Sequence, residues 1–224
     1  MPACCYACDQ LATSRDHAPP LCIFPADADS PDGKSRRNNL ITVPACDKHN
    51  LKKSKDDEYL MMVLAAPAQN NLVARSQILA KVVRAWNRRP HLATMAVRNP
   101  RPARLDGQDS MIFQVDASRF DRSMELIARA LIFHEGGSRW HGECQVWSPS
   151  MLPSKPETAS EVMVTSHNLL AALPVIFEGA DSRGTNPDVF QYRLRLPIDQ
   201  ENVGMVDLLF YEGFRVCVLL RAEA

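Results

Sequence analysis

Two short stretches, Cys5-Tyr-Ala-Cys8 and Cys46-Asp-Lys-His49, place pairs of metal-ligating side chains on either side of a 37-residue segment. Such pairs, with two residues between the ligands, fit tetrahedral zinc, and each pair can sit on one tight turn. Cys4 competes with Cys5, because a spacing of three residues also reaches the metal. Residues 1–56 are rich in loop formers and poor in large apolar side chains, so this segment needs a metal to fold. The sequence therefore predicts a structural Zn²⁺ ion held by Cys5, Cys8, Cys46 and His49.

The composition is that of an ordinary globular protein, with 46% hydrophobic and 23% charged residues. The seven cysteines are an odd number, and the N-terminus lacks the basic-then-apolar pattern of a secretion signal, which argues against a disulfide framework. The longest apolar stretch, residues 59–68, contains Pro67 and is too short to cross a bilayer. We therefore expect a cytoplasmic protein with no membrane partner.

Charge is unevenly distributed along the chain. The 26 basic and 26 acidic residues cancel, so the whole molecule has no bulk attraction to a polyanion. Between residues 34 and 55, however, seven basic residues accompany one acid, Asp47, and further arginines follow over residues 84–104. Charge runs are commonly solvated faces. Because the first run surrounds the second metal-ligand pair, Cys46 and His49, we expect it to contact phosphates.

The remainder of the chain, residues 61–224, has the patterns of an α+β domain. Apolar spacing predicts helices over residues 57–66, 72–90 and 118–135, the last ended by Gly136-Gly137. Strands are predicted over residues 111–115 and 189–196, with a hairpin of residues 206–210 and 214–220 around Glu212-Gly213. Residues 99–109 are expected to form a linker or long loop. The predicted fold class is α+β with an antiparallel sheet.

Further motifs lie between and after the ligand pairs. They read Thr13-Ser-Arg-Asp16-His17-Ala-Pro-Pro20, Asn39-Leu-Ile-Thr-Val-Pro-Ala-Cys46-Asp-Lys-His49-Asn50 and Ser54-Lys-Asp-Asp-Glu58-Tyr59. In this order they resemble the HNH endonuclease family, especially its bacterial zinc-stapled branch. The resemblance covers roughly the first 60 residues. It implies a ββα-metal (HNH) nuclease module at residues 1–60, followed by an α+β companion domain at residues 61–224.

The resemblance also implies a role for individual residues. His17 matches the general base, which takes a proton from the water that attacks the scissile phosphate. Asp16 matches a carboxylate ligand of the single catalytic metal, and Asn50 matches a second ligand of that metal. Asn39 matches the asparagine that pins the loop and orients the histidine backbone. The zinc pairs of the family correspond to Cys5, Cys8, Cys46 and His49.

These residue types suit phosphodiester hydrolysis on chemical grounds. The reaction needs an activated water and a cation beside the leaving oxygen, and histidine titrates near neutral pH. Mg²⁺ or Mn²⁺ prefers oxygen ligands and keeps several waters, so Asp16 and Asn50 suffice as protein ligands. Lys52 and Lys53 follow Asn50 and are predicted to contact the nucleic-acid backbone.

Two positions depart from the family pattern. His49 stands where the pattern usually has cysteine, a change that zinc tolerates because imidazole binds it well. The segment after His17 lacks the paired glycines that many relatives carry, and residues 25–37 form an irregular insertion instead. The second departure leaves the shape of the substrate groove open.

Three functions compete for this sequence. The favoured one is a metal-dependent HNH endonuclease, a phosphodiesterase-type hydrolase of nucleic acid, with DNA as the favoured substrate. The alternative is a non-catalytic zinc-bearing module that binds nucleic acid or protein. The intact set of Asp16, His17 and Asn50 argues against this alternative, because a pure binder is free to lose any of them. A purely structural zinc staple leaves the basic run without explanation. The sequence of residues 61–224 indicates no role for this part of the chain. It is compatible with selecting the cleavage target, holding a homodimer together or coupling cleavage to a signal.

Overall fold

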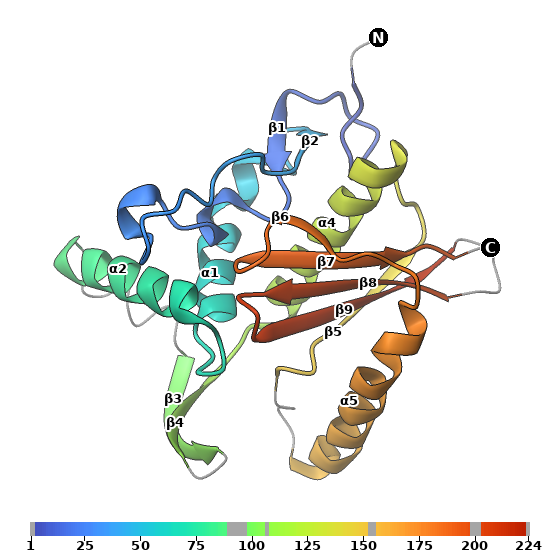
Figure 1. Cartoon of the computed structure of the whole chain (residues 1–224). Coiled ribbons are helices and arrows are strands. Elements are labelled where there is room, and N and C mark those ends of the chain that lie inside the picture. The colour runs from blue at the N-terminus through green and yellow to red at the C-terminus, as the bar shows by residue number, and fades with distance from the viewer. Residues whose placement is uncertain (1–2, 89–97, 106–107, 152–155, 198–202, 223–224) are drawn as a thin grey trace.

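The computed structural model of the chain describes residues 3–88, 98–105, 108–151, 156–197 and 203–222. It contains both helices and antiparallel strands, largely in separate runs, which confirms the predicted α+β class with antiparallel sheets. The larger sheet has five strands. Figure 1 shows helices α1 and α4 beside this sheet, the small β1–β2 hairpin near the N-terminus, and helix α5. Within the described part of the chain, no helix combines the length and apolar character needed to cross a membrane.

The N-terminal segment is organised by one hairpin. Strand β1 (Ser14–His17) pairs antiparallel with β2 (Thr42–Ala45), and Asp16 lies opposite Val43. Two single 3-10 turns, η1 (Leu21–Ile23) and η2 (Asp27–Asp29), lie in the connection between the strands. A third, η3 (Leu51–Lys53), leads into helix α1 (Ser54–Ala65). The order along this segment is therefore strand, strand, helix.

The larger sheet has the strand order β5-β9-β8-β7-β6, with antiparallel neighbours throughout. Its strands are β5 (Glu143–Trp147), β6 (Arg183–Asn186), β7 (Phe190–Arg195), β8 (Val203–Phe210) and β9 (Phe214–Arg221). The β8–β9 hairpin was predicted, but the residues with positive φ are Tyr211 (50°) and Glu212 (59°) rather than a glycine. Tyr211 tolerates this rare conformation because its side chain is fully buried and its hydroxyl donates to the Ile23 carbonyl at 2.6 Å.

Helix α4 (Ala117–Gly136) ends at the glycine pair that the sequence predicted, and its start is capped by Asp116. The Asp116 side chain accepts a hydrogen bond from the Arg119 amide at the N-cap, and Gly137 adopts φ 70° at the C-cap. The buried face of α4 includes Phe120, Met124 and Leu131 and faces the sheet.

One continuous apolar core joins the early and late parts of the chain. It contains Leu60 and Leu64 from α1, Leu131 from α4, and Val206 and Phe210 from β8. The boundary expected at residue 60 falls inside α1, whose apolar side chains belong to this shared core. The position of α1 is thus fixed by the sheet and α4 as well as by the hairpin that precedes it.

Two helices and two strands make up the rest of the described chain. Helix α2 (Leu72–Arg88) lies within the run expected to be helical. Helix α5 (Pro156–Ile176) covers part of the opposite face of the sheet. Strands β3 (Arg98–Leu105) and β4 (Gln108–Gln114) form a separate antiparallel hairpin.

The β3–β4 hairpin corrects the expectation of a linker or long loop over residues 99–109, of which residues 106–107 lie outside the described chain. Pro100 and Pro102 hid the strand, because proline lacks the amide that a central strand must donate. In a two-stranded hairpin both strands have a free edge, where proline is tolerated.

Candidate metal centre and adjoining pocket

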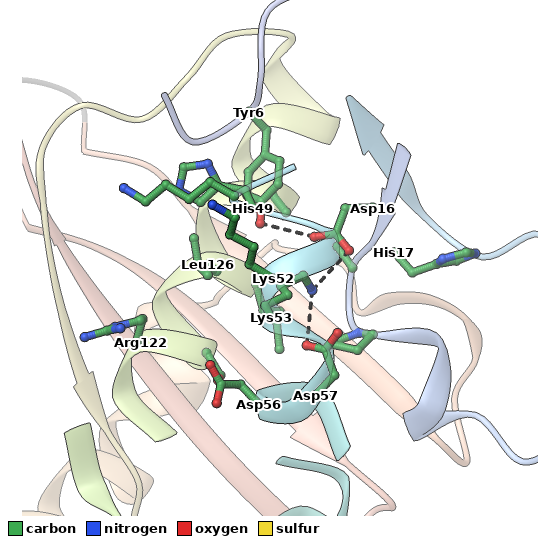
Figure 2. A pocket seen from close by; sticks show the side chains of 16 residues that line it. Tyr6, Asp16, His17, His49, Lys52, Lys53, Asp56, Asp57, Arg122 and Leu126 are labelled. Carbon is green, nitrogen blue, oxygen red and sulfur yellow. Dashed lines mark hydrogen bonds and ion pairs between the residues drawn. The ribbon is translucent and has the colours of Figure 1, made fainter. Parts of the chain in front are cut away.

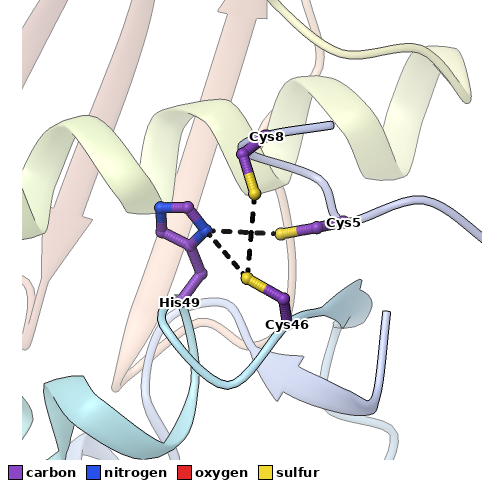
Figure 3. Close-up of side chains that lie close together, drawn as sticks. All are labelled: Cys5, Cys8, Cys46 and His49. Atoms are coloured by element: carbon purple, nitrogen blue, oxygen red, sulfur yellow. Dashed lines mark hydrogen bonds between the residues drawn. The ribbon is translucent and has the colours of Figure 1, made fainter. Parts of the chain in front are cut away.

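The structure brings the side chains of Cys5, Cys8, Cys46 and His49 into one cluster, in which the ligand atoms all lie within 4.8 Å of one another (Figure 3). Tetrahedral zinc places two sulfur ligands about 3.8 Å apart and a sulfur and a nitrogen about 3.5 Å apart. The Sγ atoms of Cys8 and Cys46 are 3.7 Å apart, and His49 Nδ1 lies 3.4 Å from the Sγ atoms of Cys5 and Cys46. Three cysteines and one histidine can therefore hold a metal such as zinc.

The same geometry decides between Cys4 and Cys5. Cys5 is fully buried and supplies a ligand atom to the cluster, whereas Cys4 is exposed. The Cys4 backbone forms an isolated bridge with Leu11, which shapes the turn that carries Cys5 and Cys8. The structure therefore selects Cys5, and not Cys4, as the partner of Cys8 in the first ligand pair.

Backbone hydrogen bonds form the two turns of the cluster. The Cys46 carbonyl accepts from the amides of His49 at 2.9 Å and Asn50 at 3.1 Å, which turns the chain back directly after β2. The Tyr6 amide donates to the Pro44 carbonyl at 2.9 Å and joins the first turn to the hairpin. Apolar contacts with Leu126, Ala130 and Phe133 of α4 complete this small cluster.

A pocket of about 530 Å³ adjoins the metal cluster (Figure 2). One wall comes from the N-terminal segment through Tyr6, β1 and the turn before α1, and the other from α4. The charged or ionisable side chains that line the pocket are Asp16, His17, Lys48, His49, Lys52, Lys53, Asp56, Asp57 and Arg122.

Asp16 lies at the buried end of this pocket and is only 5% exposed. Its carboxylate forms an ion pair with Lys53 Nζ at 3.0 Å and accepts a hydrogen bond from the Tyr6 hydroxyl at 3.2 Å. Burial raises the pKa of Asp16, while Lys53 and Tyr6 act in the opposite direction. Asp16 is therefore a buried carboxylate that is stabilised by a nearby ammonium group.

Lys53 does not extend into solvent as the sequence suggested. Its side chain is 12% exposed, and Nζ lies 3.0 Å from Asp16 and 3.2 Å from Asp57 (Figure 2). To contact the nucleic-acid backbone as predicted, the Lys53 ammonium group would have to break its ion pairs with Asp16 and Asp57.

Asp57 is a pocket residue that the sequence reasoning missed. Burial raises its pKa to about 6, against the effect of Lys53. The spacing of Lys53 and Asp57, four residues apart at the start of α1, is the sequence signal for their contact. Nothing in that spacing indicates Asp16 as the second partner of the ammonium group.

His17 lines the pocket from the last position of β1. Because successive side chains of a strand point to opposite sides, its ring points away from the Asp16–Lys53 pair, as Figure 2 shows. Burial lowers the pKa of His17, and Lys53 and Arg37 add to the effect while Asp16 opposes it. The ring is therefore neutral at neutral pH and able to accept a proton.

The two asparagines lie elsewhere and are absent from the described lining of this pocket. Asn50 Nδ2 donates to Ser14 Oγ at 2.9 Å and to the Arg15 carbonyl at 3.1 Å, so the side chain ties the turn after Cys46 to β1. Asn39 is exposed, with φ 54°, and lines a second pocket of about 340 Å³ beside β6. The structure thus brings Asp16 and His17 to the first pocket and gives Asn39 and Asn50 contacts of other kinds.

The basic run over residues 34–55 divides into inward and outward side chains. Arg36 is 5% exposed and pairs with Asp32 and Asp188. Arg37 is exposed and donates to the Phe24 carbonyl. Lys48 and Lys52 are exposed where they line the pocket. Arg122 of α4, which the sequence reasoning did not select, is exposed on the opposite wall. Its position follows from the packing of α4 against the metal cluster, which no local pattern encodes.

Comparisons of the chain with protein-family models, with curated proteins and with solved structures give no match. The HNH resemblance therefore rests on the motif residues themselves, and the chemistry of the pocket has to be argued from its own side chains.

Proposed function

We propose that this protein is a metal-dependent nuclease of the HNH type, which hydrolyses phosphodiester bonds of nucleic acid, with DNA as the favoured substrate. The observation that carries the proposal is the pocket beside the metal cluster. There the strand with Asp16 and His17 lies across from Arg122, and Lys48 and Lys52 border the same space.

The ligand set at the N-terminus suits zinc as a structural ion. All four positions are protein ligands, and such closed coordination is typical of structural rather than catalytic zinc. The hydrolytic role is therefore assigned to the pocket, and the staple holds β1, β2 and the start of α1 in place.

The ammonium group of Lys53 offers a test of whether the pocket suits a divalent cation. Asp16 and Asp57 converge on this one positive group, so their oxygens already surround a cation. Carboxylate oxygens are the ligands that Mg²⁺ and Mn²⁺ prefer. We assign Asp16 and Asp57 as the side chains that would hold the metal, with Lys53 displaced, whereas the Asn50 amide nitrogen is bound to β1. The bound ion supplies positive charge for the phosphate that is being cleaved.

The other residues of the pocket have separate tasks. His17 is assigned as the base that takes the proton of the attacking water, because its pKa is lowered. Its ring points away from the Asp16–Lys53 pair in this structure, so the role requires the side chain to turn toward the metal position. Lys48, Lys52 and Arg122 neutralise backbone phosphates and position the substrate without reading its bases. Tyr6 holds the carboxylate of Asp16 by its hydroxyl hydrogen bond.

A specific observation favours the alternative of a non-catalytic binding module. Asp16 is saturated by Lys53 and Tyr6, as expected of a structural ion pair in a protein that binds nucleic acid without cutting it. The two functions make the same prediction for binding and opposite predictions for hydrolysis.

The deciding experiment incubates the purified zinc-loaded protein with plasmid DNA and with labelled single-stranded DNA and RNA, with Mg²⁺, Mn²⁺ or a chelator of the added ion. We expect cleavage that needs the added metal and falls by on the order of 10²–10⁴ in His17→Ala. His134→Ala is the matched control, because His134 is an exposed histidine on α4 outside this pocket. Binding without cleavage under every condition would instead support the binding module, and equal cleavage by both variants would remove His17 from the chemistry.

A further inference from the structure

The ammonium group of Lys53 lies at the point where two carboxylates of the pocket converge (Figure 2). Its Nζ atom is 3.0 Å from Oδ1 of Asp16 and 3.2 Å from Oδ1 of Asp57. The other carboxylate oxygen of Asp16, Oδ2, accepts the hydrogen bond from the Tyr6 hydroxyl at 3.2 Å. Both oxygens of Asp16 therefore have a partner, and one of these partners carries a positive charge.

A divalent cation cannot share these oxygen atoms with Lys53. Mg²⁺ takes carboxylate oxygens at about 2.0–2.1 Å, so an ion held by Asp16 and Asp57 would lie against an ammonium group bound to the same two atoms. The two positive charges would repel each other strongly, because Asp16 is only 5% exposed and water screens charges little at a buried position. Metal binding and the two ion pairs of Lys53 thus exclude each other.

A phosphate group in the pocket offers Lys53 a different partner. The lysine lines the pocket together with Lys48 and Lys52, and its four-carbon stem is flexible. A phosphate that is to be cleaved must lie beside the metal position, and therefore within reach of Lys53. Phosphate oxygens form strong charge-assisted hydrogen bonds with an ammonium group. They can replace the two carboxylates as partners of a charge that is only 12% exposed and needs a partner.

We propose that Lys53 couples nucleic-acid binding to metal binding, an inference that rests on the proposed function of the pocket. Without nucleic acid, Lys53 stays on Asp16 and Asp57 and keeps the metal position closed. A bound phosphate draws the ammonium group away, and the freed carboxylates can then hold Mg²⁺ or Mn²⁺. Nucleic acid and metal each raise the affinity for the other by the same factor, because both favour the state in which Lys53 has left.

The neighbouring lysine, Lys52, provides a matched comparison. It is exposed, lines the same pocket and forms no ion pair with Asp16 or Asp57 among the described residues. Both lysines are expected to help bind the phosphate backbone, whereas only Lys53 competes with the metal. Methionine removes the charge and keeps a long unbranched side chain, so Lys53→Met and Lys52→Met separate the two effects. If Lys53→Met does not retain zinc, Lys53→Gln replaces it, because its amide can still donate a hydrogen bond to a carboxylate.

The experiment measures Mn²⁺ affinity by electron paramagnetic resonance on the zinc-loaded full chain, at one pH, with and without a short duplex DNA. Every protein also carries His17→Ala so that the DNA stays intact, and Mn²⁺ bound by DNA alone is subtracted.

With Lys53 in place, we expect DNA to tighten Mn²⁺ binding by about tenfold or more. With Lys53→Met, Mn²⁺ should bind about tenfold more tightly without DNA, and the effect of DNA should shrink by about the same factor. A smaller effect of DNA remains, because phosphate also contacts the metal directly. Lys52→Met should weaken DNA binding and leave both the Mn²⁺ affinity without DNA and the effect of DNA on it unchanged.

Three results would overturn the proposal. The first is the same Mn²⁺ affinity without DNA whether or not Lys53 is replaced, and the second is an effect of DNA that is equally large in both proteins. The third is a gain in Mn²⁺ affinity from Lys52→Met as large as that from Lys53→Met, because the effect would then be one of overall charge. If no protein binds Mn²⁺ beside the zinc, with or without DNA, the proposed function fails too. Mn²⁺ binding without the coupling removes this inference alone.

Discussion

Replacement of Cys5 by serine tests how far the metal staple controls the fold. Cys5 is one of the four side chains that could hold the metal, and the neighbouring Tyr6 amide connects its turn to β2. A serine hydroxyl is a poor zinc ligand compared with a thiolate, so the variant should lose the metal. We expect residues 3–20 and 42–50 to lose their ordered structure. Ile23 and Phe24, which belong to the shared core, should keep theirs, as should α1, α4 and the five-stranded sheet.

The size of the expected loss of stability follows from comparing two local contributions to the free energy of folding, apolar burial and zinc binding. The small apolar cluster beside the ligands contains Tyr6 and Val43 as its large fully buried side chains, and each contributes about 1.5–3 kcal/mol on burial. Zinc contributes about 10–16 kcal/mol in small zinc modules. Zinc is therefore the largest local contribution to stability. Its loss should lower the free energy of local unfolding by more than about 4 kcal/mol, which raises the equilibrium constant for local unfolding about a thousandfold. Helix α1 is spared because Leu60 and Leu64 belong to the shared core.

Hydrogen exchange read by mass spectrometry measures this difference segment by segment. The amides of Tyr6 and Thr13, which donate to Pro44 and Ala45, should lose protection by about a thousandfold or more. Amides of β8 and α4 should change little. Cys4→Ser is the matched control, since it changes an exposed cysteine one residue away. Zinc loss in Cys4→Ser but not in Cys5→Ser would refute the ligand assignment, and cooperative loss of the whole fold would refute the local character of the staple.

Three further predictions concern the pocket and the sheet. Lys52→Ala should lower the slope of log affinity for duplex DNA against log salt by about one unit, and Lys55→Ala, an exposed lysine outside the pocket, should lower it less. Asp57→Asn should weaken Mn²⁺ binding, followed by electron paramagnetic resonance, by about tenfold or more while zinc content stays constant; unchanged affinity would remove Asp57 from the metal site. Gly142→Ala should lower the free energy of unfolding by at least about 2 kcal/mol, because the new Cβ would lie 2.0 Å from a backbone oxygen of β9, whereas Gly136→Ala meets no such contact.

Local patterns predicted the parts of the structure that depend on local chemistry. The spacing of Cys5, Cys8, Cys46 and His49 gave the metal cluster, because each pair occupies one turn whose geometry depends on few residues. The apolar face and glycine end of α4 were readable for the same reason. The alternation along β7 likewise predicted a strand with one buried side, where Phe190 and Tyr192 face the core.

Contacts between distant segments were beyond such patterns. The contact of Lys53 with Asp16 joins the start of α1 to β1 across a long insertion, and Arg122 reaches the pocket only because α4 packs on the metal cluster. Asn39 and Asn50 were selected through the resemblance to the HNH family, and their contacts in this chain are with β6 and β1. A motif fixes the order of residues, whereas the pocket depends on how three separate segments come together.

The arrangement of Tyr6 links the metal staple to the pocket chemistry. Its backbone follows the ligand Cys5, its amide is fixed to β2, and its buried hydroxyl donates to Asp16 at 3.2 Å. His49 is both a ligand of the metal cluster and part of the pocket wall. A staple that only stabilised the fold would not need to share residues with the pocket. Because Tyr6 and His49 serve both, release of the zinc should displace the Asp16 carboxylate and disable the pocket before the shared core unfolds.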